Sequence, residues 1–253
     1  FFSFQYNNES EKKDEFSSDE VLGNENKDYS FDKDYIIEEK GKKSIQLGED
    51  IFWLNSGAYF ISENGIARTH QGELEEENKW RKIYDKNNPR DTDQGLHPQN
   101  IFRLVALGSW TNLYQEGYFR IVKDNKSDSE YRNDSNGLLF FNRYQDGDNL
   151  YYTGIRVDGF AVIKKKIKGK YFTLAYNQIY PGKYDREKNP NLLPRNQWIG
   201  LRSEVMNDGD DSVNIKLYID RERSGNWELV AEAVDEGNEF GENPFFSAGY
   251  GGI

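Results

Sequence analysis

Two histidines, together with nearby arginines and tyrosines, are the side chains best suited to acid–base chemistry on a carboxylate-bearing sugar. The chain of 253 residues holds only His70 and His97. In such a reaction a base removes the C5 proton of the sugar, a cation neutralises the carboxylate, and a phenol protonates the leaving oxygen. His97 or Tyr118 is the candidate base, and Arg120 is the candidate neutralising cation. These residue types predict, as one alternative, a polysaccharide lyase acting on polyuronates.

Other catalytic chemistries lack the residues that they require. The absence of cysteine excludes thiolate catalysis and disulfides. No strand carries the alternating carboxylates of a retaining glycosidase, and no glycine-rich phosphate loop is present. The two histidines also lack the spacing of a zinc site. Acidic turns at residues 146–149 and 207–211 offer oxygen ligands for a structural calcium ion, although both are equally typical of ordinary hairpin turns.

Positive charge is concentrated on a group of strand-like segments, in a chain whose formal net charge is −11. Residues 137–176 contain seven basic and three acidic side chains. Clustered cations attract anionic ligands, aromatic rings stack on sugars, and arginine binds carboxylates through two hydrogen bonds. The predicted ligand-binding residues are Tyr118, Arg120, Arg143, Tyr152, Arg156, Lys164, Lys166 and Arg202. The alternative is that these cations only solvate a sheet face and protect its edges.

The segments that would position these side chains have the pattern of β-strands. From Asp50 onward at least ten short runs rich in aromatic and β-branched residues are separated by turns such as Asp158-Gly159. Alternation places Ile199, Leu201 and Val205 on an inner face and leaves Trp198, Arg202 and Glu204 outside. The same rule places Lys165 on the apolar side of its strand. The sequence therefore predicts an all-β fold with two antiparallel sheets packed face to face.

The organisation of the rest of the chain follows from composition. Residues 1–44 are acidic and predict a solvated leader or linker, with the sandwich domain at residues 45–253. "FFSFQY" at the start either adds a strand to the body or to a neighbouring copy, or is a frayed end. Long polar connections lie at residues 72–98 and 177–196, the first with a short helical turn around residues 75–84.

The charge, hydropathy and glycosylation sequons of the chain indicate which partners and which cellular location to expect. A pI near 4.9 argues against a nucleic-acid binder, and no apolar run is long enough for a membrane span. Glycosylation sequons begin at Asn8, Asn125 and Asn133. Together these features favour an extracellular or cell-surface protein.

Two stretches, "GLLFFNRYQDGDNLYYTGIRVDGFAVIKKKIKGKYFTLAY" and "WIGLRSEVMNDGDDSVNIKLYIDRERSGNWELVAEAVD", share a meander of strands joined by Asp-Gly turns. Over residues 100–253 this pattern resembles the concanavalin A-like lectin and glucanase superfamily, whose jelly-roll fold is shared by laminin-G-like modules. The resemblance implies a jelly roll, a carbohydrate ligand and, in many lectins of this type, a structural calcium ion. "RTHQGEL" and "YFTLAYNQ" are also faintly similar to strands of jelly-roll alginate lyases.

Three functional hypotheses follow from the sequence. The leading one is an extracellular carbohydrate-binding jelly-roll domain for an acidic polysaccharide. The second is the polyuronate lyase on the same fold. The third is a structural or adhesive surface protein that self-associates by strand exchange.

Overall fold

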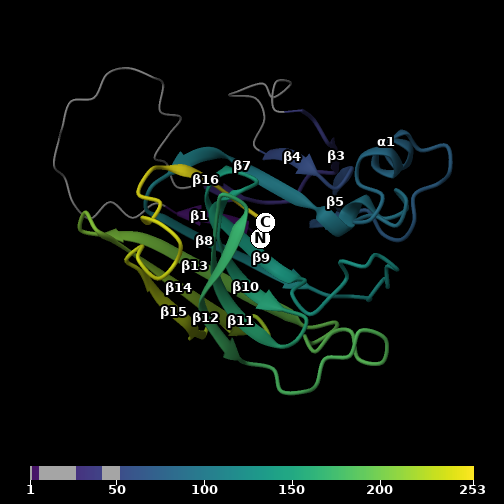
Figure 1. Cartoon of the computed structure of the whole chain (residues 1–253). Coiled ribbons are helices and arrows are strands. Elements are labelled where there is room, and N and C mark those ends of the chain that lie inside the picture. The colour runs from purple at the N-terminus through teal and green to yellow at the C-terminus, as the bar shows by residue number, and fades with distance from the viewer. Residues whose placement is uncertain (1, 6–26, 42–51) are drawn as a thin grey trace.

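The chain folds into two antiparallel β-sheets packed face to face, in a computed structural model that describes residues 2–5, 27–41 and 52–253 (Figure 1). The first sheet has the strand order β15 (Trp227–Asp235), β14 (Ser212–Arg221), β13 (Trp198–Asp208), β8 (Leu113–Arg120), β1 (Phe2–Gln5) and β2 (Lys27–Tyr29). The second sheet has the order β12 (Lys170–Gln178), β11 (Phe160–Ile167), β10 (Asn149–Arg156), β9 (Gly137–Asp146), β16 (Gly249–Gly252), β7 (Arg103–Trp110) and β4 (Phe52–Ser56). The predicted all-β sandwich is confirmed.

Alternating side chains of the two sheets form the core between them. Val213, Ile215 and Leu217 of β14 are fully buried and belong to the same cluster as Phe140 and Ile163 of the second sheet. Burying branched and aromatic side chains from both sheets is the main force that holds such a sandwich together. The period-two pattern of β13 and β14 therefore gave the correct inner face.

A buried ion pair links the two sheets, between β11 and β15. Lys165 lies on the inner face as predicted and is fully buried, and its Nζ is 2.9 Å from Oδ2 of Asp235. The ammonium also donates to the carbonyl oxygens of Glu242 and Asn243. Tyr151 donates its hydroxyl to Asp235 at 2.6 Å. Each charge thus has an opposite partner and further hydrogen bonds, which a buried pair requires.

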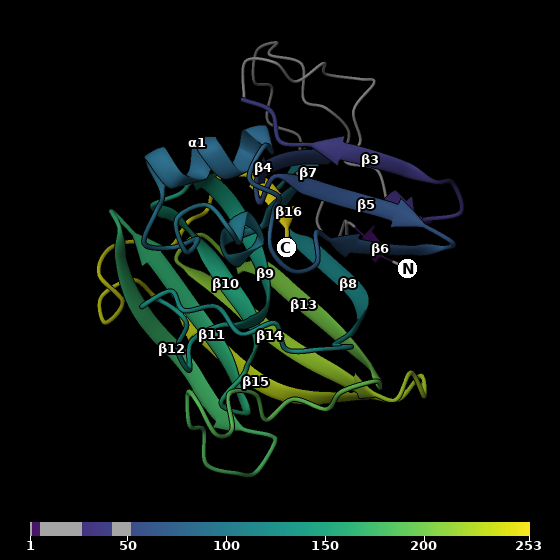
Figure 2. The same cartoon turned by 90° about the vertical axis from the view of Figure 1, so that its right-hand side faces the viewer.

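A third, smaller sheet and the helix lie at one end of the molecule. The sheet consists of β3 (Tyr35–Glu38), β5 (Tyr59–Glu63) and β6 (Ile66–Thr69), and the helices are α1 (Lys79–Asn87) and the 3-10 helix η2 (Pro98–Ile101). Figure 2 shows α1 and this sheet at the end opposite β12 and β15. The helix overlaps the short helical turn predicted around residues 75–84 but starts and ends later, and the third sheet was not predicted. In the described ranges of the chain, no helix combines the length and the apolar character needed to cross a membrane.

The first 44 residues contribute strands to both parts of the fold. β1 pairs antiparallel with β8 and β2, which is one of the two alternatives considered for "FFSFQY". β3 pairs with β5 in the small sheet. The domain boundary at residue 45 stays a prediction.

Candidate functional site

The outward face of the first sheet carries a row of aromatic rings and guanidinium groups. Its members alternate with core residues along β8, β13 and β15, or lie in the β14–β15 hairpin, so they point away from the second sheet. We call this surface the arginine–aromatic face; it comprises Tyr114, Tyr118, Arg120, Trp198, Arg202, Arg223 and Trp227. Three of the predicted binding residues, Tyr118, Arg120 and Arg202, therefore lie on one surface.

Arg202 is held in place at one end of this face. Its guanidinium carbon lies 3.9 Å from the ring centroid of Trp227 and 5.0 Å from that of Tyr114. Its Nη2 and Nε are 2.7 and 3.0 Å from Oε2 of Glu116, the residue opposite it on β8. The charge of Arg202 is thus neutralised within the protein, and its planar group serves mainly as a stacking partner for the rings.

Trp198 lies at the other end of the face beside two arginines. The guanidinium carbon of Arg120 is 4.9 Å from the Trp198 ring centroid, and that of Arg223 is 5.9 Å away. Both arginines are exposed, and neither forms an ion pair with any carboxylate in the described part of the chain. This end of the face therefore presents positive charge that the protein itself does not neutralise.

Tyr118 connects this charged end to the hairpin between β14 and β15. Its hydroxyl donates to Oδ2 of Asp220 at 2.9 Å, and burial, with that hydrogen bond, raises the pKa of Tyr118 to about 12. Asp220 also accepts hydrogen bonds from the backbone of Ser224 and Gly225, which holds the hairpin that carries Arg223. A phenol with so high a pKa remains protonated at neutral pH, so Tyr118 is poorly suited to act as a base.

Gly200 allows the rings of this face to meet across β13. A Cβ atom at Gly200 would lie 2.8 Å from the Tyr118 ring and 2.9 Å from the Trp227 ring. The two ring centroids are 5.9 Å apart. The missing side chain thus lets rings from β8 and β15 meet over the two intervening strands, β13 and β14.

The predicted basic cluster is divided between the two sheets. Tyr152, Arg156, Lys164 and Lys166 lie on the outward face of the second sheet, not beside Tyr118. The expectation that all the cations would share one face is wrong, because alternation orients side chains within a strand but does not tell which sheet the strand joins.

On that second face most of the charge is neutralised locally. Nη2 of Arg156 lies 2.8 Å from Oδ2 of Asp158 and 2.9 Å from Oδ1 of Asp134. Lys166 donates to the carbonyl of Gly147 at 2.7 Å and pairs with Asp148. Burial lowers the pKa of Lys164, and the nearby Arg156 adds to this effect. This face therefore offers an anionic ligand less free charge than the Trp198 end of the arginine–aromatic face.

Arg143 is not on a surface at all, which corrects the expectation that it belongs to an exposed binding face. The residue has a φ of +48° beside a β-bulge opposite Leu150, and its side chain is fully buried. Its Nε donates to the carbonyl of Thr111 at 2.8 Å, and Nη1 donates to the carbonyl of Phe245. Burial lowers the pKa of Arg143 to about 10. A bulge redirects side chains from the alternation of a regular strand, which explains the error.

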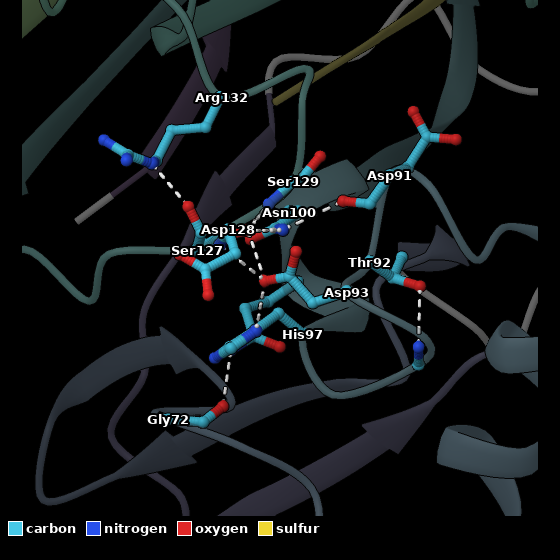
Figure 3. A network of polar contacts seen from close by, with 12 residues as sticks. Gly72, Asp91, Thr92, Asp93, His97, Asn100, Ser127, Asp128, Ser129 and Arg132 are labelled. Atoms are coloured by element: carbon cyan, nitrogen blue, oxygen red, sulfur yellow. Dashed lines mark hydrogen bonds and ion pairs between the residues drawn. The ribbon is translucent and has the colours of Figure 1, made fainter. Parts of the chain in front are cut away.

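His97 lies in a buried polar network that joins two connections of the chain (Figure 3). Its Nδ1 is 2.9 Å from Oδ2 of Asp93. The same carboxylate oxygen accepts hydrogen bonds from Oγ of Ser127 at 2.6 Å and from the backbone of Asp128 at 3.0 Å. These hydrogen bonds hold residues 127–129 against the turn that precedes η2. It shares no contact with Tyr118 or Arg120, so the three residues proposed for a lyase do not form one site in the described structure.

The acidic turns considered for calcium serve as hairpin turns. Oδ1 of Asp146 accepts hydrogen bonds from the backbone of Asp148 and from the side chain of Asn149. The carboxylate of Asp208 accepts a hydrogen bond from the side-chain amide of Asn214, and its backbone carbonyl accepts one from the hydroxyl of Ser212. Among the residues whose placement is described, no group of three or more histidines or acids could hold a metal ion.

Several members of the arginine–aromatic face were not among the predicted site residues. Alternation placed Trp198 outward, but the binding residues were predicted from clustered charge, and an indole carries none. Arg223 and Trp227 flank the Ser224-Gly225-Asn226 turn, and only the pairing of β14 with β15 brings them over Tyr118 and Arg202. The signal that could have pointed to them is a half-buried tryptophan at the start of a strand, as at Trp198 and Trp227.

Comparison with known proteins gives one distant structural similarity. No family model matches the chain, and no curated protein matches it. Among solved structures, the carbohydrate-binding module CBM66 from Bacillus subtilis is similar over 60% of this chain and 71% of that chain, with 18% sequence identity and a TM-score of 0.39. The chain is thus distantly similar in structure to a carbohydrate-binding module, at a level that assigns neither a family nor a ligand.

Proposed function

We propose that this protein is an extracellular carbohydrate-binding domain that binds an acidic polysaccharide on the arginine–aromatic face. The observation that carries the proposal is the position of Trp198 beside Arg120 and Arg223, two exposed arginines without a carboxylate partner in the described residues. An indole ring stacks on the apolar face of a sugar, and a guanidinium binds its carboxylate through paired hydrogen bonds.

The layout of the face suits a linear chain. Trp198 and Arg202 lie at the two ends of the face on the same strand, β13, and the rings of Tyr118 and Trp227 meet over Gly200 between them. A polysaccharide running along β13 would therefore meet successive rings. Its acidic groups would bind at the Trp198 end, since Arg202 at the other end is already paired with Glu116.

Affinity electrophoresis and calorimetry with polygalacturonate, alginate and fully methyl-esterified pectin test this proposal. The esterified polymer is the matched control, because it keeps the backbone and loses the charge. We expect binding to the acidic polymers, weakened at least about tenfold by Trp198→Ala, the loss of about 1.4 kcal/mol. Arg68→Ala removes an exposed arginine from the small sheet and should leave affinity unchanged. Absence of binding to every acidic polymer would refute the proposal.

The alternative functions have their own readouts in the same samples. A polyuronate lyase would raise the ultraviolet absorbance as C4–C5 double bonds form. Assembly by strand exchange would use β1, which lies between β8 and β2, and would raise the mass in solution. Comparing the mass with and without residues 1–44 tests that possibility. Exposure of Asn125 and Asn133 is compatible with the extracellular location that we propose, while Asn8 lies outside the described residues.

A further inference from the structure

A cavity of about 230 Å³ lies between the two long connections of the sandwich. One connection joins β8 to β9, and the other joins β12 to β13; both leave the sandwich on the same side in Figure 1. Ile121, Leu138 and Val157 provide apolar walls, while Asn133, Asn136 and Tyr184 provide polar ones. A concave site with apolar walls and a few polar groups is the usual form of a small-ligand pocket.

Two of the charged groups around this cavity, Asp124 and Arg132, already have opposite charges as partners. Oδ2 of Asp124 accepts hydrogen bonds from Arg195, and Oδ1 accepts one from Asn191. Arg132 donates to the carbonyl oxygens of Ser127 and Arg186 and pairs with Glu187. Lys126, the third charged lining residue, is exposed and donates to the carbonyl of Glu187. A charged ligand would have to leave water for a cavity whose Asp124 and Arg132 are already paired, which is unfavourable.

Neutral hydrogen-bonding groups remain available instead. The hydroxyl of Tyr184 is buried and has no hydrogen-bond partner, and burial raises the pKa of Tyr184, so it stays a neutral donor. Oδ1 of Asn133 and Oδ1 of Asn136 each accept a backbone N–H, from Ser135 and Asn133 respectively. The amide orientations are fixed in this way, and neither Nδ2 group makes a hydrogen bond within the described residues. An unsatisfied buried hydroxyl is costly unless a ligand or water binds it.

We propose that this cavity is a binding site for a single neutral sugar ring, with Tyr184 and Asn136 as its hydrogen-bonding residues. Sugar hydroxyls both donate and accept, which matches phenol and amide groups, and the apolar walls suit the C–H face of a ring. The site is separate from the arginine–aromatic face and does not depend on the function proposed above.

Ligand-observed saturation-transfer NMR with methyl glycosides of neutral hexoses and pentoses, followed by titration, tests this site. The protein is made in a bacterial host, so that Asn125 and Asn133, both beside the cavity, carry no glycan. We expect at least one neutral glycoside to bind, and methyl galacturonide to bind more weakly. Tyr184→Phe removes only the hydroxyl and should weaken binding about five- to tenfold.

Two control variants keep the result specific. Tyr131→Phe alters an exposed tyrosine of the same connection that does not line the cavity, and it should bind like wild type. Trp198→Ala should also leave this binding intact, which separates the cavity from the arginine–aromatic face. A free sugar and the end of a glycan share this chemistry; disaccharide glycosides that bind as tightly as the monosaccharide would identify a chain end. Binding unchanged in Tyr184→Phe, or no binding of any neutral glycoside, would overturn the proposal.

Discussion

Arg120 and Trp198 are directly paired across β8 and β13, and the guanidinium carbon of Arg120 lies 4.9 Å from the centroid of the Trp198 ring. The contact combines a large flat ring with an exposed cation. Arg223 approaches the same ring from the β14–β15 hairpin. Two cations on one indole give a sugar-stacking surface that is also selective for charge.

The first prediction concerns the salt dependence of binding. Removing both exposed arginines, in Arg120→Ala/Arg223→Ala, should abolish most of the preference for polygalacturonate over its methyl ester. Binding of the wild type should weaken as salt rises from about 0.05 M to about 0.5 M, because exposed charges are screened over roughly 4–14 Å in this range. Calorimetry at several salt concentrations measures both effects. An unchanged preference in the double variant would show that the acidic groups bind elsewhere.

The second prediction concerns the gap at Gly200. In Gly200→Ala the new Cβ would lie within 3 Å of the Tyr118 and Trp227 rings and must displace them. Polysaccharide affinity should fall, and the free energy of unfolding should drop by about 1–3 kcal/mol, as for other overpacked sites. Gly41→Ala is the matched control, since no atom lies within 4 Å of its added Cβ. Thermal unfolding together with affinity electrophoresis separates the two effects.

The alternation of apolar residues was enough to predict the sandwich and most of its inner face. Val213 and Ile215 are buried as their spacing indicated, and even Lys165 lies on the inner side to which alternation assigned it. The burial of Lys165 depends on Asp235, seventy residues later, and no local pattern contains that pairing. Strand order likewise decided which cations became neighbours. Since β10 and β11 belong to the second sheet, Arg156 and Lys164 are separated from Arg120.

The third prediction concerns His97. Substitution by glutamine should lower the free energy of unfolding by about 1–3 kcal/mol, because the buried carboxylate of Asp93 loses a hydrogen-bond partner. Polysaccharide affinity should not change, since His97 has no contact with the arginine–aromatic face. His70→Gln alters the other, less buried histidine and should have a smaller effect on stability. Formation of unsaturated sugars that His97→Gln abolishes would instead support the lyase.

The fourth prediction concerns the buried pair of Lys165 and Asp235. Lys165→Met leaves Asp235 buried without its cation and should cost about 3–5 kcal/mol in the free energy of unfolding. Lys168→Met removes a surface lysine that pairs with Glu242, and we expect a change of about 1 kcal/mol or less. Urea unfolding of the three proteins measures the difference. Equal losses in both variants would mean that Lys165 contributes no more than an exposed pair.

The last prediction concerns pH and the hairpin that carries Arg223. Burial would raise the pKa of Asp220, but hydrogen bonds from Ser224, Gly225 and Tyr118 outweigh it and lower the pKa below the usual value of 3.8. A carboxyl whose pKa is lower in the folded state stabilises the fold above its unfolded pKa, and this stabilisation is lost as the pH falls through the folded value. Asp220→Asn should therefore destabilise the protein at pH 7 and much less at the acidic end.

Asp210→Asn is the matched control for this prediction, because Asp210 is exposed in the β13–β14 turn. The free energy of unfolding is measured between about pH 2 and pH 7. The values for the wild type and Asp220→Asn should converge in acid, whereas Asp210→Asn should match the wild type at every pH. At pH 7 Asp220→Asn should also weaken binding to polygalacturonate, since Arg223 would lose its fixed position beside Trp198 and Tyr118. A constant difference in stability across the whole pH range would mean that the carboxyl of Asp220 is not what holds the hairpin.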